Sequence, residues 1–289
     1  MSNKIGVHAL VWVGGWSEAE SEKAIAATAA CGYDLIEVLL LDPQSVDPVA
    51  TARQLESHGI SATTSLGLGV DTDISSNDPD TVARGEALLN DALSVARDMG
   101  ASYLGGVLFS AVHKYSAAAT LAGRRNSVEV LARLAERAKA SGITLGLEAI
   151  NRYESNLINT GAQAVDFINE TGSDNIKVHL DTYHMNIEEE DPATTIRECG
   201  DLLGYFHVGE SHRGYLGTGT IDFKTIFRSL IDIGYTGPIT FESFSSAVVD
   251  SKLSTALGVW RNLWSDSEDL ATQAKSFLDS ELYAASQPE

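Results

Sequence analysis

The sequence predicts a closed barrel of eight parallel β-strands with helices between them, the (β/α)8 or TIM-barrel fold. Eight short apolar segments alternate with helical ones, and 289 residues is a length typical of eight such units. An open, doubly wound sheet is the alternative. However, the turn after the first predicted strand, VWVGGWSEAE, lacks the Gly-x-Gly-x-x-Gly pattern of dinucleotide-binding sheets.

The strand candidates are short segments rich in apolar and β-branched residues, each bounded by turn residues. They are residues 4–10, 35–40, 61–67, 103–109, 144–150, 176–181, 203–209 and 238–244. Helical patterns lie between them, for example at residues 17–31, 79–100 and 126–142. A glycine that can end a helix in the left-handed conformation precedes four of the strands, at Gly32, Gly59, Gly100 and Gly142.

No linker, repeat or low-complexity segment divides the chain, so we expect residues 1–289 to form a single domain with a C-terminal helical extension. Asp222 is placed to cap the helix that follows it. From Val249 the chain is expected to be helical, with Trp260 and Trp264 on one face and packed in the core, and to fray after Tyr283.

The composition excludes several classes of protein. A net charge of -20 argues against nucleic-acid and anionic-membrane partners. No apolar segment approaches the roughly 18 residues that a membrane span requires, and the N-terminal residues do not resemble a secretory signal. Cys31 and Cys199 match no metal or redox spacing. We therefore expect a cytoplasmic protein.

The last four predicted strands end in ionisable residues: Glu148, Asp181, His207 and Glu242. The carboxyl ends of the strands are where TIM-barrel enzymes carry their active sites. Side chains alternate along a strand between the barrel interior and the surrounding helices. The residues just before these four are large and apolar, whereas those two positions before are small or polar, namely Gly146, His179, Tyr205 and Thr240. The four ionisable groups should therefore converge in the barrel mouth.

Three carboxylates and one imidazole in one cleft would repel one another without a cation, so this set predicts a divalent metal site. Oxygen-rich ligands with one histidine suit Mn²⁺, Co²⁺ or Mg²⁺ better than structural zinc. The alternative is a group of unrelated buried ion pairs, but no lysine or arginine lies on these strand ends.

Other polar residues are expected around this centre. Glu154 and Arg213 follow the fifth and seventh strands, and His184 follows Asp181 by three residues. His8 and Trp12, at the end of the first strand, could line the opposite wall. His179 lies deeper and is expected to be a hydrogen-bonded core histidine. No function is assigned to His58, His113 or His212.

A metal that holds two neighbouring substrate oxygens can stabilise an enediolate. Glu148 and Glu242, on either side of the bound carbon, could pass a proton between its faces. Such a site would serve a sugar epimerase or an aldose–ketose isomerase. The acidic segments 70–80 and 186–192 favour a neutral polyol substrate, although the turn GTGTID at 217–222 could bind phosphate through its backbone N–H groups.

At these residues the chain resembles the D-tagatose/D-allulose (D-psicose) 3-epimerases of the xylose isomerase-like TIM barrels. The most specific segments are GLEAINRYESNLINTG, HLDTYHMNIEE, HVGESHRGYLGTG and ITFESF, and the resemblance covers essentially the whole chain. It implies a free ketose as substrate, a homodimer or homotetramer, and Mn²⁺, Co²⁺ or Mg²⁺ as cofactor. Its implied metal ligands are Glu148, Asp181, His207 and Glu242.

The resemblance also implies that Glu148 and Glu242 act as the two acid/base groups at C3 of the ketose, through a metal-bound cis-enediolate. It implies that Glu154, His184 and Arg213 hold the substrate near O1 and O2. The chain has His8 where several relatives have tyrosine, and Ser211-His212 where many have Cys-Asn. These differences leave the sugar open among D-fructose/D-allulose, D-tagatose/D-sorbose and L-ribulose/L-xylulose.

Two other reactions remain as alternatives. A C1–C2 sugar isomerase of the same superfamily would use a similar metal centre. An endonuclease IV-like enzyme would need a basic groove and more histidine ligands, which the charge of -20 and the seven histidines argue against. A non-catalytic sugar-binding protein would not need two carboxylates flanking a metal.

Overall fold

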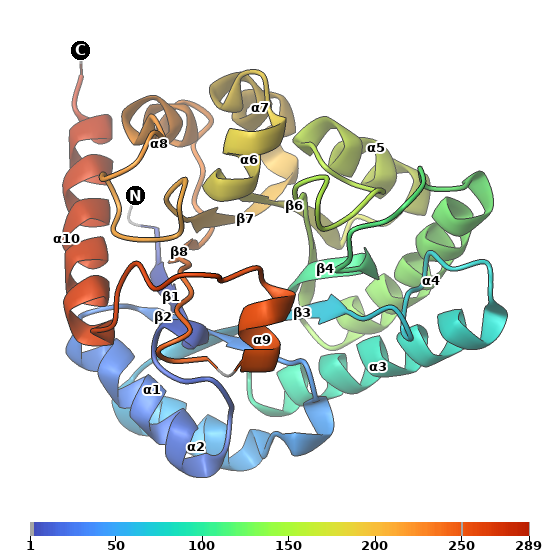
Figure 1. Cartoon of the computed structure of the whole chain (residues 1–289), viewed down its shortest axis with the longest axis horizontal. Helices are drawn as coiled ribbons and strands as arrows, with labels where there is room; N and C mark the ends of the chain where they lie inside the picture. The colour runs from blue at the N-terminus through green and yellow to red at the C-terminus, as the bar shows by residue number, and fades with distance from the viewer. Residues whose placement is uncertain (1–2, 250, 289) are drawn as a thin grey trace.

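The computed structural model describes residues 3–249 and 251–288. Eight parallel strands close into a barrel in which each strand lies beside its neighbours in sequence and β1 pairs with β8 (Figure 1). The strands are β1 (Ile5–His8), β2 (Leu35–Leu39), β3 (Ser61–Leu68), β4 (Tyr103–Ala111), β5 (Thr144–Glu148), β6 (Ile176–Asp181), β7 (Leu203–Val208) and β8 (Ile239–Phe241). The predicted (β/α)8 TIM barrel is confirmed.

Helices surround the barrel and connect its strands (Figure 1). They are α1 (Glu18–Ala30), α2 (Pro48–His58), α3 (Pro79–Asp98), α4 (Leu121–Ala140), α5 (Gly161–Thr171), α6 (Thr182–Glu188), α7 (Pro192–Cys199), α8 (Phe223–Asp232), α9 (Ser251–Ala256) and α10 (Ser267–Ser286), with 3-10 turns η1 (Ala9–Val11), η2 (Pro43–Ser45) and η3 (Gly200–Leu202). Asp222 caps α8 as predicted, because its side chain accepts a hydrogen bond from the Thr225 N–H.

The predicted alternation of side chains along the last four strands is confirmed. The apolar residues next to the ionisable ones are fully buried in the main hydrophobic core. The inward residues contact one another inside the barrel: the Tyr205 hydroxyl lies 2.7 Å from the Thr240 hydroxyl, and the Tyr205 and His179 rings are 4.8 Å apart. This interior layer supports the ionisable groups above it.

The C-terminal segment differs from the prediction of a continuous helix. Helix α9 is short, residues 257–266 form a loop, and α10 continues past Tyr283 to Ser286. The two tryptophans therefore separate. Trp264 is buried and its indole N–H donates to the Ser243 hydroxyl at 2.7 Å, whereas Trp260 is 77% exposed. The expectation that both pack in the core was wrong for Trp260, because a loop does not keep the i, i+4 spacing on one face.

Within residues 3–249 and 251–288, no helix has the length and apolar character needed to cross a bilayer.

Candidate active site and metal centre

The four ionisable residues at the ends of β5 to β8 converge at one point of the barrel mouth. Glu148, Asp181, His207 and Glu242 each offer one ligand atom, and these atoms all lie within 4.8 Å of one another. All four side chains are buried. Three hard carboxylate donors and one imidazole form a set suited to a divalent ion such as Mn²⁺, Co²⁺ or Mg²⁺.

The orientation of His207 fits a metal ligand. Its Nε2 atom lies 2.7 Å from a carboxylate oxygen of Glu37, on β2. Its Nδ1 atom lies 3.5 Å from Glu148 Oε1 and 3.7 Å from Glu242 Oε1, and this buried atom has no hydrogen-bond partner among the residues that the structure describes. A buried nitrogen that faces two carboxylates without a partner is the arrangement expected of an atom that donates to a cation.

The pKa values of the three carboxyl groups in the cluster differ because their surroundings differ. Burial raises the pKa of Glu148 to about 7 and that of Asp181 to about 6. Burial acts on Glu242 too, but the charges of Arg213 and His207 outweigh it and hold the pKa of Glu242 below its ordinary value. Two neighbouring carboxyl groups that differ in this way suit general acid–base chemistry.

Arg213, in the loop after β7, reaches back into this cluster. Its Nη1 atom contacts Glu242 Oε2 and lies 3.2 Å from Asp181 Oδ2. The guanidinium lies between the rings of Tyr183 and Phe244, at 4.0 and 4.8 Å from their centroids. No lysine or arginine lies on the strand ends, but Arg213 reaches the carboxylates from a loop, so the expectation that no basic residue pairs them was wrong.

The backbone of Arg213 holds the side chain in place. Its φ of 62° lies in the left-handed region, which is uncommon for a residue other than glycine. The Arg213 N–H donates to the Glu210 carbonyl at 2.8 Å, and the Ser243 hydroxyl donates to the Arg213 carbonyl. Such conformations persist where surrounding contacts fix them, and they cluster at functional sites.

His184 and Glu154 lie on the β5–β6 side of the cluster. His184 Nδ1 accepts a hydrogen bond from the Asn151 N–H, and its Nε2 atom lies 3.6 Å from Asp181 Oδ2 and 3.8 Å from Glu148 Oε1. Glu154 accepts from the side-chain amide of Asn151 at 2.8 Å. Asn151 therefore orients two residues that the sequence singled out, while burial lowers the pKa of His184 and keeps it neutral.

Of the two residues expected from the end of the first strand, His8 lies beside the cluster and Trp12 lies in the core. His8 is buried beside the cluster, with Nε2 at 4.0 Å from Glu242 Oε1, and its ring meets the Phe244 ring edge-on. Trp12 instead belongs to the main hydrophobic core, so the expectation that it lines the opposite wall was wrong. The chain turns into the 3-10 turn η1 directly after His8, and the residues that follow no longer alternate as in a strand.

His179 is buried as expected, but the hydrogen bonds expected for it are not present. Neither ring nitrogen has a hydrogen-bond partner among the described residues. The ring instead meets the rings of Tyr205 and His207 edge-on, and burial lowers its pKa well below the ordinary value. A neutral imidazole in an aromatic layer is consistent with this lowered value.

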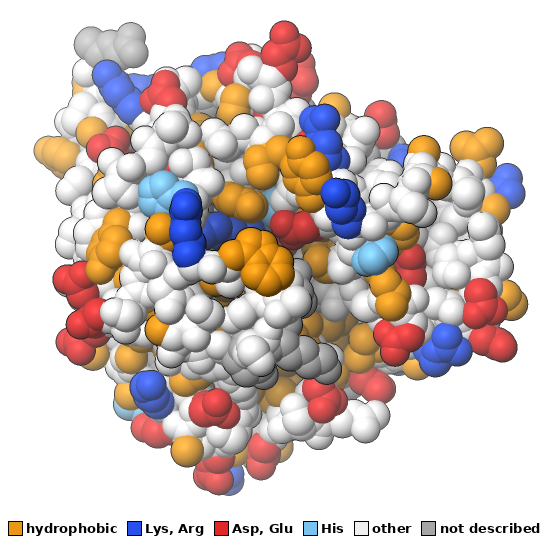
Figure 2. Space-filling view, viewed as in Figure 1, with side chains coloured by type: hydrophobic (Ala, Val, Ile, Leu, Met, Phe, Trp, Pro, Cys, Tyr) orange, Lys and Arg blue, Asp and Glu red, His pale blue; other side chains and the backbone are white. Residues whose placement is uncertain are grey.

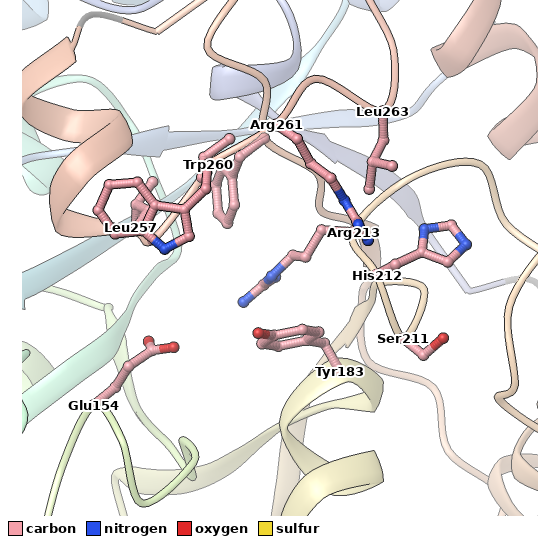
Figure 3. A pocket seen from close by; sticks show the side chains of 12 residues that line it. Glu154, Tyr183, Ser211, His212, Arg213, Leu257, Trp260, Arg261 and Leu263 are labelled. Atoms are coloured by element: carbon pink, nitrogen blue, oxygen red, sulfur yellow. The ribbon is translucent and has the colours of Figure 1, made fainter.

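A pocket of about 340 Å³ opens beside the cluster. Glu154 and Tyr183 lie on one side of it and Trp260, Arg261 and Leu263 on the other, with the Arg213 side chain pointing between them (Figure 3). None of the four converging residues lines this pocket, and Arg213 connects the two, because it lines the pocket and pairs with Asp181 and Glu242. Around the centre of this face, basic and histidine side chains lie together with hydrophobic side chains and an acidic one (Figure 2).

The two acidic segments do not line this pocket. Asp73 accepts a hydrogen bond from the Tyr115 hydroxyl at 2.6 Å, and Glu188 pairs with Arg152 at 2.7 Å. In the turn at 217–222, the Gly217 and Thr220 N–H groups donate to the side chains of Glu210 and Ser211. Asp73, Glu188 and these N–H groups therefore make contacts within and between the loops.

The chain matches a known protein family. A family model described as "Xylose isomerase-like TIM barrel" matches residues 25–280. The chain belongs to this family.

The chain is 51% identical to an L-ribulose 3-epimerase of Methylomonas sp. (strain DH-1), over 94% of this chain and 96% of the relative. It is 48% identical to a ketose 3-epimerase of Arthrobacter globiformis, over 97% of each chain. Among solved structures, a D-allulose 3-epimerase from Methylomonas sp. in complex with D-allulose is 50% identical, with a TM-score of 0.95 over 96% of this chain and 97% of that one. The resemblance to ketose 3-epimerases within the xylose isomerase-like family is confirmed.

Several residues at this site were missed from the sequence. Glu37 lies within the apolar segment LIEVLL, where a single acidic residue pointing into a barrel was itself a signal. Tyr183 and Phe244 each follow a metal-ligand candidate by two residues, and their contact with Arg213 depends on loop paths that strand periodicity does not describe.

Proposed function

We propose that this protein is a metal-dependent ketose 3-epimerase that interconverts free ketoses at C3. The observation that carries the proposal is the convergence of Glu148, Asp181, His207 and Glu242 within 4.8 Å beside an open pocket. Relatives named L-ribulose 3-epimerase and ketose 3-epimerase, about half identical over nearly the whole chain, support the reaction and the substrate class.

The four convergent residues would hold a divalent ion, with Mn²⁺, Co²⁺ and Mg²⁺ as candidates. When bound, the ion supplies positive charge that stabilises an oxyanion on the substrate. Glu148 and Glu242 are the acid/base pair: one removes the C3 proton and the other protonates the opposite face of the resulting enediolate. The reverse reaction exchanges their roles, so each must be able to hold and release a proton.

Glu154, His184, Arg213 and His8 are the proposed substrate contacts. Arg213 presents its guanidinium between two aromatic rings and beside the carboxylates, where it can donate to a ketose oxygen while its own orientation stays fixed. His8 reaches the same point from β1.

The position of proton exchange tests the reaction. In D₂O, D-allulose formed from D-fructose should carry deuterium at C3 and none at C1, because carboxyl groups exchange their protons with solvent. NMR or mass spectrometry of the purified product measures this. Deuterium at C1 or C2 would instead indicate a C1–C2 isomerase, and an unlabelled epimer would reject the two-glutamate mechanism.

Metal removal tests the role of the ion. Chelator-stripped protein should be inactive and should regain turnover when Mn²⁺ or Co²⁺ is added. Measuring this turnover across a panel of free ketoses also identifies the preferred sugar.

A further inference from the structure

Glu37 is a buried carboxylate that the proposed proton transfers do not use. It lies in the middle of β2, is 1% exposed, and crosses the barrel interior to a residue 170 positions later in the chain, His207. Buried ion pairs contribute little net stability, because desolvation offsets their attraction. The position of this carboxylate therefore requires another explanation, and it makes a 2.7 Å contact with the imidazole of a proposed metal ligand.

The contact determines which His207 nitrogen can bind a cation. An ionised carboxylate only accepts hydrogen bonds, so the 2.7 Å contact between Glu37 Oε2 and His207 Nε2 requires the hydrogen on Nε2. In the neutral ring the lone pair is then on Nδ1. Nδ1 is the atom that faces Glu148 and Glu242, and within residues 3–249 and 251–288 it has no hydrogen-bond partner.

A second imidazole lies against the other oxygen of the same carboxylate. His8 Nδ1 accepts a hydrogen bond from the Leu10 N–H, so neutral His8 carries its hydrogen on Nε2. That atom lies 3.7 Å from Glu37 Oε1. Glu37 thus lies between His8 on β1 and His207 on β7, and its two oxygens face one ring each.

We infer that Glu37 is a positioning residue that sets the tautomer and ring orientation of His207, so that Nδ1 is presented to the divalent ion. The inference rests on the metal centre of the proposed function. Carboxylates that accept the second N–H of a metal-binding histidine typically change metal affinity by about 10- to 100-fold when they are replaced.

The test measures Mn²⁺ binding without substrate or turnover. Chelator-stripped wild-type, Glu37→Leu and Glu37→Gln proteins are titrated with Mn²⁺, and free Mn²⁺ is followed by electron paramagnetic resonance. Glu37→Leu removes the acceptor and should raise the Kd by roughly 10- to 100-fold. Glu37→Gln keeps an amide oxygen that can accept, so its Kd should lie between those of the wild type and Glu37→Leu.

The matched control is Glu22→Leu. It removes a carboxylate oxygen that lies 2.9 Å from His58 Nε2 in an exposed pair on the outside of the molecule, and it should leave the Mn²⁺ Kd unchanged. In ¹⁵N-histidine-labelled wild-type protein loaded with the diamagnetic ion Mg²⁺, long-range ¹H–¹⁵N spectra should show His207 protonated at Nε2 and not at Nδ1, with the signal assigned by its loss in His207→Gln. The Glu37 variants should shift this pattern, which a general loss of packing would not do selectively.

Wild-type Kd values and an unchanged His207 tautomer in folded Glu37 variants would overturn the inference and leave the proposed function intact. Conversely, a wild-type protein that binds Mn²⁺ but epimerises no ketose would overturn the proposed function and leave the role of Glu37 intact. If circular dichroism shows Glu37→Leu unfolded, the near-isosteric Glu37→Gln decides: a Kd raised at least threefold supports the inference, and an unchanged Kd rejects it.

Discussion

The two halves of the barrel contribute different parts of the site. Strands β5 to β8 each end in or lead directly into one of the four convergent ionisable residues. Strands β1 to β4 supply none of these four, and instead provide His8 and Glu37, which contact the cluster from the opposite side. The second half thus carries the proposed metal ligands and acid/base groups, while the first half supplies Glu37, the residue proposed to orient His207.

Replacing Glu148 or Glu242, both from the second half of the barrel, should have the largest effect on kcat. The result would show whether catalysis depends on that half. Glu148→Gln and Glu242→Gln should each lower kcat for epimerisation by about 10²- to 10⁴-fold or more, because an amide cannot take or give the proton. Steady-state rates at saturating Mn²⁺ and ketose measure this. Glu86→Gln, which alters an exposed pair with Arg133, should retain the wild-type kcat. Comparable rates in all three variants would remove the assignment of the acid/base pair.

Removing the guanidinium of Arg213, which contacts the carboxylates of the cluster, should have the next largest effect on activity. Arg213→Ala should lower kcat/KM by roughly 10- to 100-fold, and Arg213→Lys should not restore it, because an ammonium cannot stack between Tyr183 and Phe244 in the same way. Arg97→Ala, at an exposed pair with Asp98, is the control. A full rescue by lysine would show that charge alone matters at this position.

The smallest effect on kinetics is expected at the rim of the pocket, in the loop between α9 and α10. Trp260→Ala should raise KM by a fewfold at most and leave kcat unchanged, because the exposed indole borders the pocket and lies outside the group of converging ligand atoms. Tyr283→Ala, an exposed aromatic residue on α10, is the matched control. A large loss of kcat in Trp260→Ala would extend the catalytic region from the strand ends to the C-terminal loop.

The barrel and the convergence of its four ionisable residues could be predicted because strands have a strict two-residue period. Once Leu147 or Phe241 is assigned to the core, Glu148 or Glu242 must point inward. The same rule makes Glu37 of β2 point inward, although it lies in the middle of its strand and not at the end. The position of Trp260 and the reach of Arg213 could not be predicted in this way, since both depend on loop paths that tertiary contacts decide.

The pairing of β1 with β8 has a consequence for the synthesis of the protein. The Asn3 side chain donates to the carbonyls of Tyr235 and Gly237, so the residue that precedes β1 by two positions is bound to the segment that leads into β8. Chains leave the ribosome N-terminus first, and contacts between residues distant in sequence form slowly. The ring of strands therefore closes only after β8 has emerged, and the group that completes the cluster, Glu242, emerges with it. A nascent chain that ends before residue 242 presents at most three of the four convergent groups.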